Sequence, residues 1–236
     1  GGNALGGAIY NNSSNIASIY ADFVGNYAIS SRDGSTAFSA YGGAIINQAK
    51  IGVIKSNFIG NYVENTSGSN SAGGGAIYNR NGDGIDEIIG NFERNYALSN
   101  EGNVAGGAIY NNSSTINIIK GNFDSNYGIG LNSANGGAIN NNNNGVIGEI
   151  VGNFTDNYIE STGEGNATGG AIVNFNQIDS IIGNFVNNYA KSVSGNAIGG
   201  AIRNAEPSSE TALGIGEISG DFINNYAESE SGQALG

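Results

Sequence analysis

Isoleucine, phenylalanine and tyrosine recur along this chain at fixed intervals, and glycine and asparagine separate them. A block of 12 residues, Ile-x-x-Ile-x-small-Asn/Asp-Phe-x-x-Asn-Tyr, occurs seven times without an insertion. Its apolar positions do not keep the three- and four-residue spacing of an amphipathic helix over a long window, and turn-forming residues interrupt them. Short segments of isoleucine, phenylalanine and tyrosine between such turns predict β-strands.

A second motif, Gly-Gly-Ala-Ile-x-Asn, alternates with this block. Its alanines are Ala8, Ala44, Ala76, Ala108, Ala138, Ala171 and Ala201. Chain length varies only after the asparagine of this motif and after the tyrosine of the block, so the turns are expected there. The sequence predicts one continuous all-β array over residues 1–236, a single parallel β-helix (solenoid) with about seven coils and three strand-bearing segments per repeat. Both ends stop in the same phase of the repeat, which predicts a segment of a longer array.

Identical residues in such a solenoid stack about 4.8 Å apart along the axis. An asparagine amide has both a donor and an acceptor, so a column of asparagines can hydrogen-bond along its length. We expect three structural ladders. The first consists of Asn11, Asn47, Asn79, Asn111, Asn141, Asn174 and Asn204; the second of Asn26, Asn61, Asn95, Asn126, Asn157, Asn188 and Asn225; the third of Phe23, Phe58, Phe92, Phe123, Phe154, Phe185 and Phe222.

Three other columns have expected roles. The paired glycines fit backbone with positive φ or a close approach between coils. The position between the isoleucine and the asparagine of the glycine motif is too mixed for a core, so we expect it to point outward, with Tyr10, Tyr78 and Tyr110 as surface candidates. The block tyrosines fit a packed column better than an exposed aromatic ladder. The mixed position holds Tyr10, Ile46, Tyr78, Tyr110, Asn140, Val173 and Arg203; the block tyrosines are Tyr27, Tyr62, Tyr96, Tyr127, Tyr158, Tyr189 and Tyr226.

The composition excludes much chemistry. The chain has no histidine, cysteine, methionine or tryptophan, which removes thiol chemistry, the commonest general base and most familiar metal ligands. Its 20 acidic residues are scattered, so we expect no catalytic residues and no cofactor. The net charge of −12 argues against nucleic acid and anionic membrane as partners. No apolar run is long enough for a membrane span, so this segment is not expected to insert into a membrane.

One segment has the ligand spacing of a calcium loop. In residues 79–87, oxygen-bearing side chains alternate and a glycine stands sixth, which makes Asn79, Asn81 and Asp83 candidate calcium ligands. The twelfth position is Gly90, where a calcium loop needs a carboxylate. Because Asn79 and Ile85 also belong to structural columns, a polar turn is the favoured interpretation.

Two long turns are the expected places for specific recognition, because loops on a rigid scaffold carry recognition more often than its stacked core. They span residues 28–41 and 205–214. A tolerated insertion explains them equally well. The candidate recognition residues are Arg32, Asp33, Phe38, Tyr41, Glu206, Pro207 and Glu210.

Gly-Gly-Ala-Ile in strict alternation with Phe-x-x-Asn resembles the repeats of the chlamydial polymorphic outer membrane proteins and related bacterial autotransporter passengers. The resemblance covers residues 6–225. It implies a right-handed β-helical passenger that is displayed on a bacterial surface, acts as an adhesin and binds a host or cell-surface protein or glycan. The chain departs from that pattern because it has no cysteine and no carboxy-terminal transporter barrel.

The leading expectation is therefore a non-catalytic, extracellular adhesin passenger or stalk. The alternative is a structural subunit of an extracellular filament, whose partners are further copies of itself or further repeats of the same chain. A polysaccharide-degrading enzyme of the pectinase sort comes third, because it needs clustered carboxylates beside a basic residue.

Overall fold

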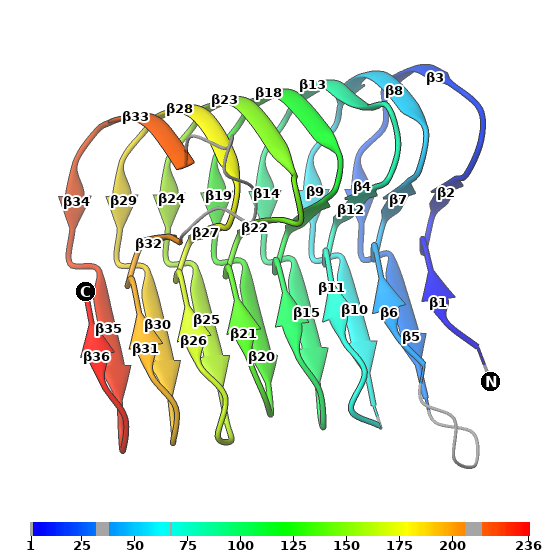
Figure 1. The fold of residues 1–236 in the computed structure, drawn as a ribbon. Helices are drawn as coiled ribbons and strands as arrows, with labels where there is room; N and C mark the ends of the chain where they lie inside the picture. Colours follow the sequence, from blue (N-terminus) through cyan, green and yellow to red (C-terminus); the bar gives the residue numbers. More distant parts are fainter. Residues whose placement is uncertain (1, 32–37, 67, 206–213) are drawn as a thin grey trace.

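The chain folds as a parallel β-solenoid in this computed structural model, which describes residues 2–31, 38–66, 68–205 and 214–236. The described residues form 36 strands and no helix, so none of them belongs to a helix that could cross a membrane. All strand pairs are parallel and join each strand to its counterpart in the next coil (Figure 1). The predicted all-β solenoid of about seven coils is confirmed.

Each coil contains five short strands rather than the three segments expected, and they build five sheets, labelled A to E in chain order. Four sheets have seven strands and sheet A has eight. Sheet A consists of β1 (Ala4–Leu5), β6 (Ala40–Tyr41), β11 (Ala72–Gly73), β16 (Val104–Ala105), β21 (Ala134–Asn135), β26 (Ala167–Thr168), β31 (Ala197–Ile198) and β36 (Ala234–Leu235). Sheet B consists of β2 (Ile9–Asn11), β7 (Ile45–Asn47), β12 (Ile77–Arg80), β17 (Ile109–Asn112), β22 (Ile139–Asn142), β27 (Ile172–Asn174) and β32 (Ile202–Asn204).

The 12-residue block spans the other three sheets. Sheet C consists of β3 (Ile16–Ile19), β8 (Lys50–Lys55), β13 (Gly84–Ile89), β18 (Thr115–Lys120), β23 (Val146–Val151), β28 (Gln177–Ile182) and β33 (Gly214–Ser219). Sheet D consists of β4 (Phe23–Val24), β9 (Phe58–Ile59), β14 (Phe92–Glu93), β19 (Phe123–Asp124), β24 (Phe154–Thr155), β29 (Phe185–Val186) and β34 (Phe222–Ile223). Sheet E consists of β5 (Tyr27–Ser30), β10 (Tyr62–Asn65), β15 (Tyr96–Ser99), β20 (Tyr127–Gly130), β25 (Tyr158–Ser161), β30 (Tyr189–Ser192) and β35 (Tyr226–Ser229).

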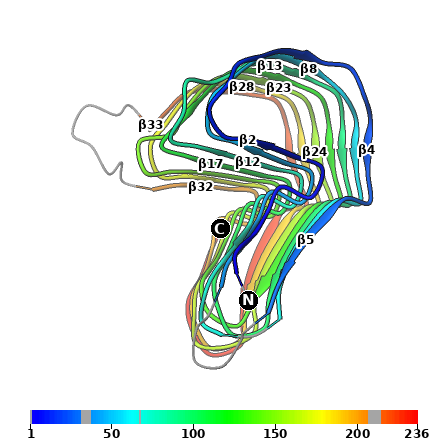
Figure 2. The same cartoon turned by 90° about the vertical axis from the view of Figure 1, so that its right-hand side faces the viewer.

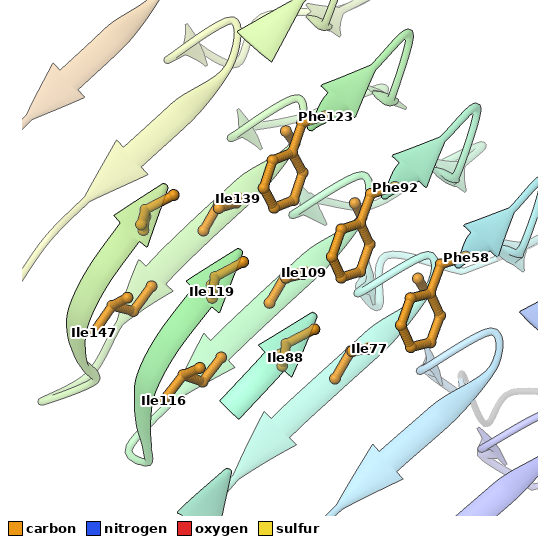
Figure 3. Close-up of a cluster of buried hydrophobic side chains, with 14 of the residues drawn as sticks. Phe58, Ile77, Ile88, Phe92, Ile109, Ile116, Ile119, Phe123, Ile139 and Ile147 are labelled. Carbon is orange, nitrogen blue, oxygen red and sulfur yellow. The ribbon is translucent and has the colours of Figure 1, made fainter. Parts of the chain in front are cut away.

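Viewed along the axis, each coil has a wide lobe and a narrow lobe (Figure 2). Isoleucine, alanine and phenylalanine from sheets B, C and D fill the wide lobe. The phenylalanine ladder is confirmed, with ring centroids 4.7–5.0 Å apart and nearly parallel planes (Figure 3). The narrow lobe lies between sheets A and E and holds a second core of smaller side chains, mostly alanine with Val63, Val104 and Ile159.

Both asparagine ladders are confirmed. In the first, each side-chain Nδ2 donates to the Oδ1 of the next coil at 2.8–2.9 Å. In the second, the backbone N–H and the Nδ2 of each asparagine both donate to the next Oδ1 at 2.9–3.0 Å. A further asparagine ladder, additional to the three predicted ladders, precedes the phenylalanines: the backbone N–H of Asn122, for example, donates to Asn91 Oδ1 at 2.9 Å.

The two glycines of each pair have different roles. The first adopts the left-handed region, as Gly106 does with a φ of 67°. The second touches the next coil: a Cβ built on Gly107 would overlap the carbonyl oxygen of Gly137. Glycine adopts positive φ without steric cost and has no Cβ to collide with the next coil. The repeated pair therefore marks the corner between sheets A and B.

One expectation about side-chain exposure is wrong. The mixed position of sheet B was expected at the surface, but Ile46, Tyr78, Asn140 and Val173 are buried, and only the first coil keeps a well exposed residue there. The reason is the concave corner between sheets A and B, where the outer face of sheet B turns toward sheet A (Figure 2). Tyr41 of sheet A stacks on Tyr78 of sheet B, with ring centroids 4.5 Å apart.

Candidate functional site

A cleft of about 240 Å³ opens along this concave corner. Sheet A contributes Tyr41 and Asn135, sheet B contributes Tyr110, Asn140 and Asn142, and the turn before β16 contributes Asn103. The remaining lining consists of two serines and the small apolar pair Val104 and Ala105. The cleft is therefore built almost entirely from amide, hydroxyl and phenol groups. None of the described residues that line it carries a charge.

Two of the lining residues, Tyr41 and Tyr110, belong to a stack of three tyrosines. Tyr41 lies on Tyr78, and Tyr78 lies on Tyr110 with ring centroids 4.9 Å apart and an angle of 17° between the planes. Burial raises the pKa of Tyr78 and of Tyr110, so both phenols are protonated at neutral pH. Asn112 Nδ2 donates to the Tyr78 hydroxyl at 3.0 Å, and Asn142 hydrogen-bonds the Tyr110 hydroxyl.

Asn140 stands where a fourth tyrosine would continue the stack, because the register pairs Tyr110 with Asn140 and Asn140 with Val173. Its side chain is 1% exposed, and its Oδ1 has no hydrogen-bond partner. A buried polar atom without a partner destabilises a fold by about 1–3 kcal/mol. Among the described residues, Asn140 is the one that combines such an atom with a place in the cleft.

Two other asparagines offer donors to the cleft. Asn103 Oδ1 accepts from the backbone N–H of Ser133 at 3.0 Å, and Asn135 Oδ1 accepts from the Thr168 hydroxyl at 2.7 Å. Their oxygens are therefore used within the protein, and each presents its NH₂ group instead. The cleft thus combines amide donors with one unpaired acceptor.

The candidate calcium residues are separated by the fold. Asn79 is buried in the first asparagine ladder, where its Oδ1 accepts from Asn47 Nδ2 at 2.9 Å. Asn81 and Asp83 are exposed in the turn before β13, and Asn81 has a φ of 50°. The ladder therefore uses the oxygen that a calcium ion would need. Across the described ranges, no group of three or more acidic, histidine or cysteine side chains is arranged to hold a metal.

The block tyrosines form the packed column that the sequence favours. Neighbouring rings lie 4.8–5.2 Å apart with planes within 19° of parallel. Each interior ring covers the faces of its neighbours, so the column presents ring edges and hydroxyls to solvent. The hydroxyl of Tyr189 donates to Glu160 Oε1 at 2.8 Å. This surface lacks the free ring faces on which a ligand could stack.

Of the seven predicted recognition residues, five lie outside the described residues: Arg32, Asp33, Glu206, Pro207 and Glu210. Phe38 and Tyr41 are described, and only Tyr41 lines the cleft. The sequence also singles out Tyr110, which lines the cleft from sheet B. It missed Asn103, Asn135, Asn140 and Asn142, although one signal was present: in the mixed column an asparagine follows the last tyrosine, at position 140.

Comparison with models of known protein families, with curated proteins and with solved structures found no match to this chain. The likeness to polymorphic outer membrane protein repeats, and the right-handed sense that it implies, stay predictions.

Proposed function

We propose that this chain is a non-catalytic binding module of an extracellular bacterial surface protein, the passenger or stalk of an adhesin. The observation that carries the proposal is the uncharged cleft with its buried, unpaired acceptor, held on a rod of stacked coils. Such a site suits binding rather than reaction. Its lining has no carboxylate, whereas glycoside hydrolysis generally needs two of them.

The scaffold supports a role in which a binding site is held at a distance. Five parallel sheets, stacked phenylalanines and hydrogen-bonded asparagines join every coil to the next along one axis. A solenoid of this kind transmits its geometry from coil to coil, because each repeat contacts its neighbours. The acidic surface, with a net charge of −12, keeps such a rod soluble and apart from anionic membranes.

Binding to cells tests this proposal. Fluorescently labelled chain is added to cultured epithelial cells, and bound label is measured by flow cytometry with increasing unlabelled chain as competitor. An adhesin gives saturable binding that the unlabelled chain displaces. Binding that does not saturate, at the level of an unrelated protein of similar size and net charge, contradicts the proposal.

The filament remains the alternative, and its signature is different. A filament subunit grows into polymers as its concentration rises, which sedimentation and electron microscopy of the purified chain detect. An adhesin stalk stays a rod of fixed length under the same conditions. Growth into regular filaments without any binding to cells favours the structural alternative.

A further inference from the structure

The cleft has the hydrogen-bonding character of a site for hydroxyl groups. It offers donors from Asn103 and Asn135 and an acceptor at Asn140 Oδ1. A sugar hydroxyl both donates and accepts, so a carbohydrate can satisfy all three groups at once. A hydroxyl held in place by the bound sugar would supply the hydrogen bond that the buried Asn140 Oδ1 lacks. This favours a sugar over water as the occupant of the cleft.

The tyrosine stack provides the apolar part of the same site. Tyr78 covers one face of the Tyr110 ring at 4.9 Å. The opposite face looks toward the next coil, where the shorter side chain of Asn140 occupies the column. An aromatic face beside amide groups suits the C–H surface of a sugar ring, because the ring packs on the face while its hydroxyls reach the amides.

The charge pattern restricts the ligand to neutral sugars. None of the described lining residues is charged, and the whole chain carries a net charge of −12, which repels sulfated, phosphorylated or sialylated ligands. Arg80 lies beside the stack, with its guanidinium carbon 5.7 Å from the centre of the Tyr78 ring, but it does not line the cleft.

The shape argues against a peptide. Peptide recognition depends on a buried aromatic or aliphatic anchor that fills a deep apolar pocket. Apart from the rings of Tyr41 and Tyr110, the apolar lining here is limited to Val104, which is fully buried, and Ala105. At about 240 Å³ the cleft is also smaller than the roughly 300–1,000 Å³ of a closed small-molecule pocket, so it fits a short stretch of a longer ligand.

We propose that this cleft binds a neutral oligosaccharide, with a hydroxyl donating to Asn140 Oδ1 and a sugar ring packing on the part of the Tyr110 ring that lines the cleft. This inference deepens the proposed adhesin function and rests on it for its biological setting. It assigns the specificity of the module to the asparagine that ends the stack of Tyr41, Tyr78 and Tyr110. Of the described residues in the long turns that the sequence favoured, Tyr41 lines the cleft.

A glycan array tests the inference directly. The full chain is applied to immobilised neutral α- and β-linked oligosaccharides beside sialylated and sulfated counterparts and short peptides, and the dissociation constant of the best neutral oligosaccharide is then measured by calorimetry. We expect signals on neutral glycans, with a Kd that changes by less than about twofold between low and high salt, because no ion pair is formed. Signals confined to anionic glycans or to peptides overturn it, as does the absence of any signal.

Two variants assign the binding to the cleft. Asn140→Val introduces the residue that the same column has in the next coil, Val173, and Asn140→Tyr continues the stack and fills the cleft. Both substitutions suit the column, and far-UV circular dichroism checks the fold. Each is expected to raise the Kd about tenfold or more, the effect of losing one well-placed hydrogen bond to a sugar. The matched control is Asn117→Ala, on the exposed face of sheet C, which should leave the Kd unchanged.

The results separate this inference from the proposed function. If the Asn140 variants lose binding to the glycan and also to cells, the glycan site and the adhesin function are both supported. If they bind the glycan with an unchanged Kd, the inference is wrong. Cell binding that persists without glycan binding leaves the adhesin proposal intact and places its contact elsewhere. Glycan binding without cell binding supports the cleft and contradicts the adhesin.

Discussion

At the scale of single residues, asparagine holds the coils together. Asn126 is fully buried, and its Oδ1 accepts both from the backbone N–H of Asn95 and from Asn95 Nδ2. Its own Nδ2 donates to Asn157 Oδ1 and to the carbonyl of Phe92. One side chain therefore satisfies groups from the coils on both sides. A charged or purely donating side chain cannot replace it, because the ladder needs both functions at every step.

Truncation of Asn126 is the direct test of this ladder. Asn126→Ala leaves the buried backbone N–H of Asn95 without its acceptor, so we expect a loss of about 2 to 3 kcal/mol in the free energy of unfolding. Urea denaturation followed by circular dichroism measures it. Asn117→Ala, which removes an exposed amide, should change stability by less than about 0.5 kcal/mol. Equal losses in the two variants contradict the ladder's role.

A second residue-scale feature is a left-handed position two residues after each phenylalanine. Glycine occupies it in the first two coils, as Gly25 and Gly60, and later coils have non-glycine residues there, including Ser125 with a φ of 56°. The left-handed region is unfavourable for a residue with a Cβ by about 1 kcal/mol. The later coils therefore carry strain that the first two avoid.

Exchange of residue types at this position should shift stability in opposite directions. Ser125→Gly is expected to raise the free energy of unfolding by about 1 kcal/mol, and Gly60→Ala to lower it by about the same amount. No atom lies within 4 Å of a Cβ built on Gly60, so backbone strain alone is measured there. Thermal melting compares the two variants. A destabilised Ser125→Gly shows that its side chain matters more than its φ.

At the scale of strands and corners, the second glycine of each pair lies tightly against the backbone of the next coil. A Cβ on Gly107 would overlap the backbone oxygens of Gly137 and Tyr127. Gly137 lies at the same corner of the next coil, and Tyr127 begins β20 of sheet E. Backbone cannot move aside as a flexible side chain can. The corner between sheets A and B therefore exists only where the pair is glycine.

Gly107→Ala should be far more damaging than a glycine replacement in open space. We expect a loss of more than about 3 kcal/mol, because the methyl group must push two coils apart and disturb the hydrogen bonds on both sides. Hydrogen exchange should show lost protection in β17 and β22 first. Gly60→Ala is the matched control, since it adds the same methyl group without a contact. Similar losses in both variants contradict the close-approach explanation.

The sequence predicted which residues stack in columns, but it did not predict the shape of the corners between the sheets. The rigid spacing of Ile116, Ile119 and Phe123 identified the register of the stack, and the columns of Asn111 and Asn126 identified both ladders. The five-strand coil was missed because strands as short as β19 leave no periodicity to detect. The cleft was missed because it depends on the angle between sheets A and B. That angle covers Asn140 on the outer face of sheet B, and nothing in the alternation along one strand indicates it.

At the scale of the whole molecule, the tyrosine column links stability to alkaline pH. Burial is the first cause that raises the pKa of Tyr96 and Tyr158 to about 12, and neighbouring tyrosines and glutamates add to it. In the unfolded chain a phenol titrates near pH 10. The folded state therefore keeps protons that the unfolded state releases, so this contribution to stability is complete below about pH 10 and is lost as the pH rises toward 12.

Alkaline titration should accordingly show unfolding and tyrosine ionisation together. We expect the tyrosinate absorbance of Tyr96, Tyr127, Tyr158 and Tyr189 to appear in one cooperative step as circular dichroism reports loss of the strands. Tyr96→Phe removes one titrating group and should make the decline of stability with pH less steep between pH 10 and 12. Ionisation of the whole column near pH 10 with the fold intact contradicts this prediction.

A coil should be removable as a unit, because a solenoid's stability is a sum of repeats and the interfaces between neighbours. The second asparagine ladder defines the end points of such a deletion, because Asn157 and Asn188 are 31 residues apart and occupy the same column. Deletion of residues 158–188 joins Asn157 to Tyr189, so β24 meets β34 with Phe154 on Phe222. The shortened chain should melt cooperatively at a somewhat lower temperature and form a rod about 4.8 Å shorter in small-angle scattering. Deletion of residues 158–187 removes one residue fewer, which places an extra residue inside the invariant block. That variant should lose register and fold poorly, and equal folding of both deletions contradicts the picture of a stack whose columns fix its register.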